Sequence, residues 1–220
     1  MIIVLTGVDG SGKTTQAKRL CDALCERDID ARYEHLTGPN LSVTRKLKDR
    51  IGEAFLDRED KAQLPADGRE TEISSNSLGT FQLMGLFFLY RGTWQSWYNI
   101  VSNKDADVII LDRFLYDDLV RVHWKYRYNV DWLAKLKHFV PDPDIVFWLD
   151  TRPEVAWERE SDGRTTVKQH ERKKESVDTI CRRILTDRNT MQIDTSEQSI
   201  EEVHSQIIAK TLRTHDNKSE

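Results

Sequence analysis

The stretch Gly-Val-Asp-Gly-Ser-Gly-Lys-Thr at residues 7–14 decides the fold of this chain. It matches the pattern G-x-x-x-x-G-K-[ST] of phosphate-binding loops. The apolar run Met1-Ile-Ile-Val-Leu precedes it, as a buried strand would, and apolar residues at helical spacing follow it to about residue 27. A strand, a glycine-rich loop and a helix in this order bind the phosphates of a nucleoside triphosphate, so we predict such a site here.

The residue types in the loop suit that role. Glycine lets the backbone bend until successive N–H groups point inward at an anion. Lys13 can reach the β- and γ-phosphates, and the Thr14 hydroxyl can bind Mg²⁺. The alternative is a glycine-rich turn that binds nothing, which the flanking strand and helix disfavour. We expect ATP and Mg²⁺ as cofactors, with the donor nucleotide held by Gly7, Val8, Asp9, Gly10, Ser11, Gly12, Lys13, Thr14 and Thr15.

The composition limits the classes of function. The chain has 220 residues, enough for one large domain or one domain with a lid, and 38% of them are hydrophobic. A formal net charge of −4 argues against broad binding to nucleic acid or to a membrane surface. No apolar run approaches the roughly 20 residues that span a bilayer. The three cysteines have no metal-ligand spacing, which suggests a reducing, cytoplasmic setting.

Apolar runs alternate with helical patterns along the rest of the chain. We predict further strands at 31–36, 107–112 and 144–150, a fifth that ends at Asp194, and a long aromatic helix over about 77–103. This order predicts a three-layer αβα sandwich with a five-stranded parallel sheet, whose ligands bind at the carboxyl ends of the strands. We expect one domain over 1–212, an exposed loop or insertion at 57–75, a helical lid at 159–174 and a flexible tail at 213–220.

Two further groups of residues suit phosphoryl transfer. Asp112 closes an apolar strand, where it can hold Mg²⁺, and Arg113 would then clamp a phosphate of the acceptor. The alternative is a helix-capping carboxylate followed by a surface arginine. A basic stretch with Arg159 and Arg164 follows the fourth strand, where arginines of a mobile lid would neutralise the transferred phosphoryl group. As a plain run of charges, it would be only a solvated helix face.

At these motifs the chain resembles the thymidylate kinase-like family of P-loop nucleoside monophosphate kinases. The phosphate loop, with an acid at its third position, is similar to that of the family, and Leu86-Phe-Phe-Leu-Tyr-Arg91 is similar to its L-F-x-x-x-R. Asp112-Arg-Phe114 is similar to the family's D-R-[YF]. The segment 141–159 is similar to its P-D-x-x-x-x-L-D…P-E-x-x-x-x-R entry to the lid.

The resemblance implies roles in binding the acceptor. Asp9 would approach a sugar hydroxyl, and Arg113 would bind the acceptor phosphate. Phe87 would stack on thymine, while Arg91 would hydrogen-bond the edge of that base. Residues four apart on a helix project from one face, which suits this pair. The alternative is that Phe87 belongs to the plain core and Arg91 extends its charge to the surface.

The resemblance also implies a catalytic group and an assembly. Gly10 has no side chain, which fits the variant of the family whose catalytic arginine comes from the lid, here Arg159 or Arg164. A homodimer is implied as well, with the aromatic helix from Ser77 as a reasonable interface. Periodicity alone does not separate such an interface from deep core.

Two departures from the family pattern concern the acceptor. The family usually has an R-E-P-G-G-T-like segment after its second strand, whereas this chain has His35-Leu-Thr-Gly-Pro-Asn40, without arginine. After Asp112-Arg-Phe114 the family often has a small hydroxyl residue, whereas this chain has Tyr116-Asp117-Asp118. An extra carboxylate repels an anionic acceptor unless it binds a metal or a sugar hydroxyl.

We therefore expect a kinase that transfers the γ-phosphoryl group of Mg-ATP to a nucleoside monophosphate, with dTMP converted to dTDP. A small-molecule acceptor is then the main partner, with no nucleic acid and no membrane. One alternative is a kinase of the same fold that phosphorylates a nucleoside, a sugar or a different monophosphate. Another is a nucleotide-binding regulatory module, which would bind ATP without phosphorylating an acceptor.

Overall fold

A five-stranded parallel sheet forms the centre of the molecule, in the order β2-β3-β1-β4-β5. The structure is a computed structural model, and it describes residues 1–35, 75–126, 128–160, 166–185 and 189–219. The strands are β1 (Ile2–Gly7), β2 (Ala31–His35), β3 (Val108–Asp112), β4 (Ile145–Asp150) and β5 (Thr190–Asp194). Every neighbouring pair runs parallel, which confirms the sheet predicted from the sequence.

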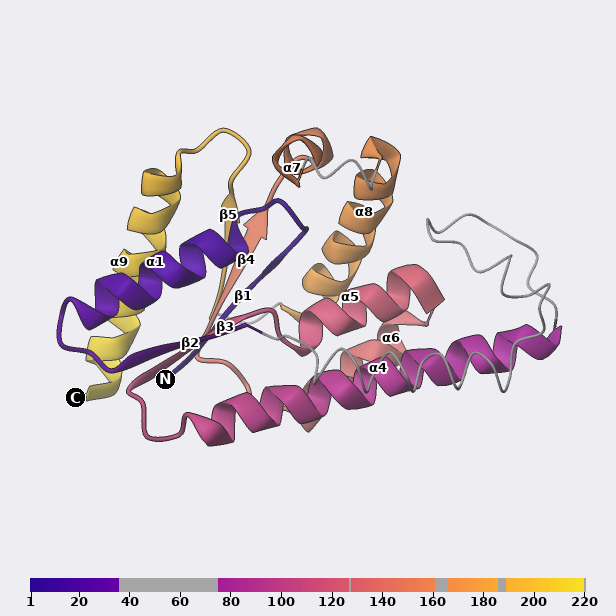
Figure 1. Cartoon of the computed structure of the whole chain (residues 1–220), viewed down its shortest axis with the longest axis horizontal. Helices are drawn as coiled ribbons and strands as arrows, with labels where there is room; N and C mark the ends of the chain where they lie inside the picture. The colour runs from indigo at the N-terminus through magenta and orange to yellow at the C-terminus, as the bar shows by residue number, and fades with distance from the viewer. Residues whose placement is uncertain (36–74, 127, 161–165, 186–188, 220) are drawn as a thin grey trace.

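Helices cover both faces of this sheet (Figure 1). They are α1 (Lys13–Cys25), α4 (Ser75–Ser102), α5 (Leu115–Tyr126), α6 (Val130–Ala134), α7 (Pro153–Glu160), α8 (Val167–Ile184) and α9 (Ile200–Ser219), with a 3₁₀ helix, η1, at Lys135–Phe139. Ile3 lies in a core shared with α1 and α9, whereas its neighbour Val4 lies in a core shared with α5 and α8. Successive side chains of a strand face opposite sides, so both faces of β1 are buried and the three layers follow.

The strand register brings the carboxyl ends of the central strands together. Leu5 pairs with Asp112 of β3, and His35 of β2 pairs with the same residue. On the other side of β1, Gly7 pairs with Leu149 of β4. The loops that follow β1, β3 and β4 therefore meet at one edge of the sheet, which is where parallel sheets bind ligands.

The structure describes most of the predicted tail but almost none of the predicted insertion. In the stretch 213–220, predicted as a flexible tail, α9 continues as helix through Ser219. Lys218 Nζ lies 2.5 Å from Asp144 Oδ1, before β4, and ties the end of this helix to the sheet. The insertion expected at 57–75 lies outside the described residues except for Ser75, which begins α4. In the part of the chain that is described, no helix is both long enough and apolar enough to cross a membrane.

Candidate active site

The phosphate loop fits closely beneath α7. Gly10 has φ +82°, and a Cβ atom built there would lie 2.2 Å from the carbonyl oxygen of Ala156 in α7. Gly12, with φ +91°, directly precedes α1, which begins at Lys13. The backbone N–H of Ser11 donates to the carbonyl oxygen of Val8 at 3.2 Å, closing the turn. Glycine is required at Gly10 by both the backbone angle and the lack of space.

Lys13 is buried at the centre of the loop. Its Nζ atom donates to the carbonyl oxygens of Gly7 at 2.9 Å and Val8 at 2.7 Å, and lies 3.9 Å from Asp9 Oδ1. Burial lowers the pKa of Lys13, while the carboxylates of Asp117 and Asp9 oppose that effect. The loop thus holds one ammonium group where phosphates would bind.

Asp112 has the features of a magnesium ligand. Thr14 Oγ1 donates to Asp112 Oδ2 at 2.5 Å, Tyr33 Oη donates to the same oxygen at 3.2 Å, and His35 Nδ1 lies 2.9 Å from it. The carboxylate is fully buried, and its other oxygen, Oδ1, has no hydrogen-bond partner within the described residues. A hydroxyl and a buried carboxylate are oxygen donors of the kind that Mg²⁺ uses, so Thr14 and Asp112 fit this ion.

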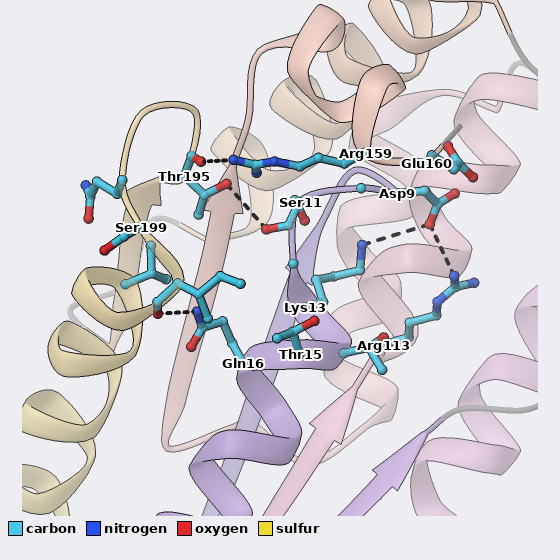
Figure 2. A pocket seen from close by; sticks show the side chains of 16 residues that line it. Asp9, Ser11, Lys13, Thr15, Gln16, Arg113, Arg159, Glu160, Thr195 and Ser199 are labelled. Atoms are coloured by element: carbon cyan, nitrogen blue, oxygen red, sulfur yellow. Dashed lines mark hydrogen bonds and ion pairs between the residues drawn. The ribbon is translucent and has the colours of Figure 1, made fainter. Parts of the chain in front are cut away.

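A cavity of about 660 Å³ opens above the loop (Figure 2). Residues from the loop, from the ends of β3 and α7, and from the start of α9 form its wall. Its lining residues are Asp9, Gly10, Ser11, Gly12, Lys13, Thr14, Thr15, Gln16, Arg113, Arg159, Glu160, Thr195, Gln198, Ser199, Ile200 and Val203. The volume and the phosphate loop suit a donor nucleotide, and we name this space the donor cavity.

Arg159 reaches into the donor cavity from α7. Its Nη2 atom donates a hydrogen bond to the carbonyl oxygen of Thr195 at 2.9 Å, and Figure 2 shows the guanidinium extending toward that residue. The Thr195 hydroxyl lies 2.6 Å from that of Thr151 and donates to the carbonyl oxygen of Ser11 at 3.3 Å. Thr195 therefore joins the phosphate loop to the segment after β5, a contact that the sequence did not reveal.

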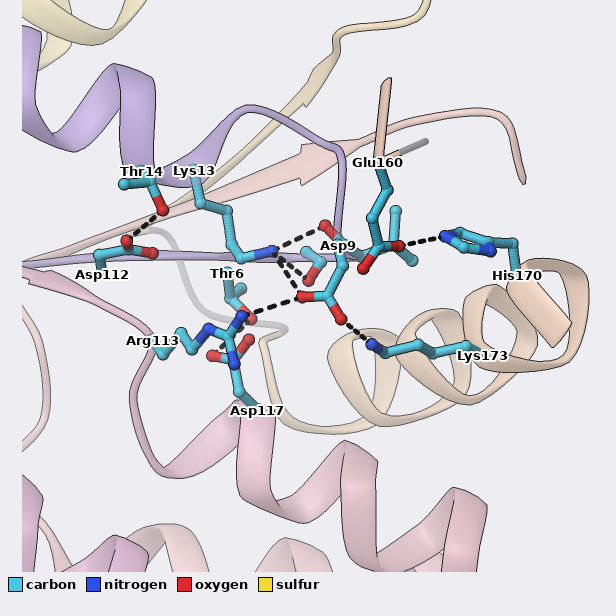
Figure 3. Close-up of polar contacts among 12 residues, drawn as sticks. Thr6, Asp9, Lys13, Thr14, Asp112, Arg113, Asp117, Glu160, His170 and Lys173 are labelled. Atoms are coloured by element: carbon cyan, nitrogen blue, oxygen red, sulfur yellow. Dashed lines mark hydrogen bonds and ion pairs between the residues drawn. The ribbon is translucent and has the colours of Figure 1, made fainter. Parts of the chain in front are cut away.

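Asp9 is surrounded by three cationic side chains (Figure 3). Arg113 Nη2 donates to Asp9 Oδ1 at 3.1 Å, Lys173 Nζ of α8 donates to Asp9 Oδ2, and Lys13 lies close by. Burial would raise the pKa of Asp9, but the charges of Lys173, Lys13 and Arg113 outweigh it and hold the pKa well below its ordinary value. Asp9 is thus a stable anion in the phosphate loop.

A second cavity, of about 140 Å³, adjoins the first and is named the acceptor cavity here. Its lining residues are Gly7, Asp9, Arg113, Asp117, Val120, Arg121, Trp124, Lys173 and Val177. Asp9 and Arg113 line both cavities, so the two spaces meet at this ion pair. Two adjoining sites that share a guanidinium allow one anionic group to pass from a donor to an acceptor.

Comparison with known proteins agrees with this geometry. The thymidylate kinase family model matches residues 5–207. The chain belongs to the thymidylate kinase family. Probable thymidylate kinase of Methanococcus aeolicus is 26% identical, with 96% of this chain and 95% of the relative covered. Thymidylate kinase of Leptospira borgpetersenii serovar Hardjo-bovis is 28% identical, with 88% and 85% covered. Probable thymidylate kinase of Pyrococcus horikoshii is 30% identical, with 67% and 63% covered. The enzyme class predicted from the motifs, a phosphotransferase, is confirmed.

The two acidic residues that depart from the thymidylate kinase pattern have different surroundings. Asp117 lines the acceptor cavity and accepts hydrogen bonds from Thr6 Oγ1 at 3.4 Å and from the backbone N–H of Phe114 at 3.1 Å. Burial raises the pKa of Asp117, and Lys13 and Arg113 oppose that effect. The carboxylate therefore braces the turn between β3 and α5 while facing the site.

Asp118 is buried between two arginines. Its Oδ1 atom lies 3.4 Å from Arg91 Nη2 of α4 and 3.2 Å from Arg121 Nη1 of α5. A Cβ atom at Gly92 would lie 2.2 Å from Asp118 Oδ2. The absence of a side chain at Gly92 therefore lets α4 pack close to this carboxylate. Asp118 thus connects Arg91, which is expected to hydrogen-bond the base, with Arg121, which lines the acceptor cavity.

Two predicted site residues lie outside what the structure describes. Arg164 falls in the stretch 161–165, and the side chain of Phe87 is not among those described. Across that stretch, Glu160 Oε2 of α7 lies 2.6 Å from Nε2 of the buried His170 in α8. The roles of Arg164 and Phe87 stay predictions, while α7 and α8 are joined by a contact that the sequence did not indicate.

Lys173 is a functional candidate that the sequence alone did not single out. It belongs to the basic stretch that follows the fourth strand, where charge alone did not separate it from its neighbours. A signal was present, because Lys173 stands four residues before Val177 and therefore shares a helix face with the buried Val177, Ile180 and Ile184. A lysine on the buried face of a helix is a stronger candidate than one on a solvated face.

Proposed function

We propose that this chain is a kinase that transfers the γ-phosphoryl group of Mg-ATP to the phosphate of dTMP, giving dTDP. The observation that carries this proposal is the contact between the donor and acceptor cavities at Asp9 and Arg113. The relatives named as thymidylate kinases support dTMP as the acceptor. A phosphoryl group bound at Lys13 in the donor cavity would lie next to Asp9 and Arg113. These two residues also line the acceptor cavity, where the acceptor phosphate would bind.

Alignment and charge neutralisation would account for the catalysis. An acceptor phosphate is already an anion, so the reaction needs no strong general base. Lys13 would follow the migrating phosphoryl group, and Thr14 and Asp112 would hold Mg²⁺. Bound there, Mg²⁺ supplies positive charge against the phosphate oxygens. Arg159, which lines the donor cavity, and Arg164 would close over the transferred group and exclude water.

The acceptor would extend from the shared wall toward α4. Arg113 would bind its phosphate and Asp9 a sugar hydroxyl, since both side chains line the acceptor cavity. Arg91, held beside Asp118, would hydrogen-bond the base, and Phe87 would stack on it.

The cysteines Cys21, Cys25 and Cys181 are free, which supports a reducing, cytoplasmic setting for this enzyme.

One observation favours a second candidate function. Asp117 adds a carboxylate to the acceptor cavity, where it would repel an anionic acceptor but could accept a hydrogen bond from a hydroxyl group. A kinase of the same fold that phosphorylates a nucleoside, a sugar or another monophosphate would use such a group. A regulatory module that binds ATP without turnover would need neither the acceptor cavity nor Arg113.

Substitution of Lys13 tests the proposed function. With Lys13→Ala, we expect the dTMP-dependent release of ADP from Mg-ATP to fall by at least about a hundredfold, because a buried cation no longer stabilises the transferred charge. Lys18→Ala is the matched control, since Lys18 is an exposed lysine of the same helix. Circular dichroism verifies the fold of both variants. Undiminished turnover by Lys13→Ala would contradict the proposal.

Substitution of Arg91 tests the base-binding role separately. With Arg91→Ala, we expect the KM for dTMP to rise by about tenfold while the KM for ATP stays close to that of the wild type. Arg91 lies on α4, beside Asp118 and away from the residues that line the donor cavity. An unchanged KM for dTMP would remove Arg91 from the acceptor site.

A further inference from the structure

Five charged side chains line the acceptor cavity, and they come from separate parts of the fold. The cations are Arg113 after β3, Arg121 of α5 and Lys173 of α8, and the anions are Asp9 of the phosphate loop and Asp117 of α5. Figure 3 shows Lys173 pointing from α8 toward Asp9, with Arg113 and Asp117 across that carboxylate from it. Three cations around so small a space are suited to a group with more than one negative charge.

We propose that Lys173 binds the phosphate of the acceptor. It would replace the arginine that the family pattern has after β2 and that this chain lacks. This inference rests on the proposed function and names one further residue of that same site. The segment 35–40 contains no arginine, so the cation expected there must come from elsewhere if the acceptor is a phosphate ester. Lys173 lies within the predicted lid, 159–174, on the part of it that forms the first half of α8.

The balance of charge explains why a third cation is needed. Among the described residues that line the cavity, Arg113 is held by Asp9 at 3.1 Å, and Arg121 by the buried Asp118 at 3.2 Å. Without Lys173, the two arginines would only offset Asp9 and Asp117, and a phosphate dianion would enter a lining with no excess positive charge. Lys173 supplies that excess, and desolvation in the cavity strengthens its attraction for a phosphate.

Neighbouring contacts fix α8 so that Lys173 reaches the cavity. Lys174 Nζ lies 2.9 Å from Asp150 Oδ1, at the end of β4, and 2.5 Å from Asp178 Oδ1. His170 contacts Glu160 of α7 at 2.6 Å. Lys173 itself contacts Asp9 Oδ2, yet its side chain is 29% exposed, so its ammonium group is both oriented and open to a ligand.

The test compares a ligand that carries the phosphate with one that lacks it. We would measure the Kd of dTMP and of thymidine by calorimetry for the wild type, Lys173→Met and Lys173→Arg. With Lys173→Met, dTMP should bind about tenfold more weakly, because a charge-assisted hydrogen bond to the phosphate is lost, and thymidine should bind as before. Lys173→Arg should recover most of the dTMP affinity.

The controls separate ligand binding from general effects of charge or fold. Lys104→Met removes an exposed lysine from the loop before β3 and should leave both Kd values unchanged. The KM for ATP should stay near the wild-type value in Lys173→Met. Equal losses for dTMP and thymidine would mean that Lys173 only positions Asp9 and would overturn the inference, as would an unchanged affinity of Lys173→Met for dTMP.

Failure of the proposed function would be visible in the wild type. If another monophosphate supports turnover in place of dTMP, the dTMP assignment is contradicted, and the same comparison is made with that monophosphate and its nucleoside. Loss of affinity confined to the monophosphate would then still support Lys173 as a phosphate ligand. A wild type that phosphorylates only acceptors without a phosphate would overturn both proposals.

Discussion

Asp9 connects the two halves of the candidate site through its two carboxylate oxygens. Oδ1 accepts a hydrogen bond from Arg113, and Oδ2 accepts one from Lys173. One residue of the phosphate loop therefore holds the end of β3 and the side of α8 in fixed positions. Because the ion pairs favour its charged form, the protonation of this one carboxyl should influence the stability of the whole site.

The pH dependence of stability should reveal the charge on Asp9. Its pKa is lowered in the folded state, so the stabilisation is present above the ordinary pKa of an aspartate, about 3.9, and is lost as the pH falls toward the lowered value. Asp9→Asn should therefore lower the free energy of unfolding at neutral pH, and its difference from the wild type should shrink below about pH 4.

Urea unfolding at several pH values measures this effect. Asp22→Asn, an exposed aspartate on α1, is the matched control and should show little difference at any pH. A difference between Asp9→Asn and the wild type that stays constant from neutral to acidic pH would contradict the ion-pair account.

Among the elements, the contact between the phosphate loop and α7 should be the least tolerant of change. The loop meets α7 at Gly10, where no space exists for a side chain, and α7 also supplies Arg159 to the donor cavity. With Gly10→Ala, we expect ATP to bind at least about tenfold more weakly, because the loop must leave its φ of +82° or move away from Ala156. Calorimetric titration with Mg-ATP measures this, and wild-type affinity in the variant would show that the close packing is not needed.

The sequence predicted the elements better than the contacts between them. Continuous apolar runs such as 144–150 identify buried parallel strands, and the glycine pattern identifies the phosphate loop, because both depend on local physics. The contact between Lys173 and Asp9 depends on how α8 packs against the sheet, which no local pattern specifies. The ion pair of Lys218 with Asp144 is a similar case, since it joins the end of α9 to a residue far away in the chain.

For the molecule as a whole, the described residues include a surface on α4 that has no assigned role. Tyr90, Trp94 and Tyr98 follow at intervals of four residues, so they share one face of the helix, and their exposed fractions are 69%, 64% and 62%. Large aromatic side chains gathered on one exposed face are typical of a surface that another protein covers. We expect a second copy of this chain to cover it, as the resemblance to the family implied.

The mass in solution tests this assembly. Light scattering after size-exclusion chromatography should give twice the mass of one chain for the wild type and the mass of one chain for Trp94→Glu, because a charge cannot be buried unpaired in an apolar interface. Glu201→Lys, an exposed change of charge on α9, should leave the wild-type mass unchanged. A wild type that elutes as a single chain at micromolar concentration would contradict the expected homodimer.

The central claim, that γ-phosphoryl transfer from Mg-ATP to dTMP occurs where the donor and acceptor cavities meet, is tested most directly by acceptor-dependent ADP release. The panel of acceptors contains dTMP, dUMP, UMP, CMP, AMP, GMP, thymidine and several sugars, with Lys13→Ala as the inactive control. We predict strong stimulation by dTMP, formation of dTDP in equal amount to ADP, and no stimulation in Lys13→Ala. If no monophosphate stimulates ADP release while the protein still binds ATP, the account is contradicted.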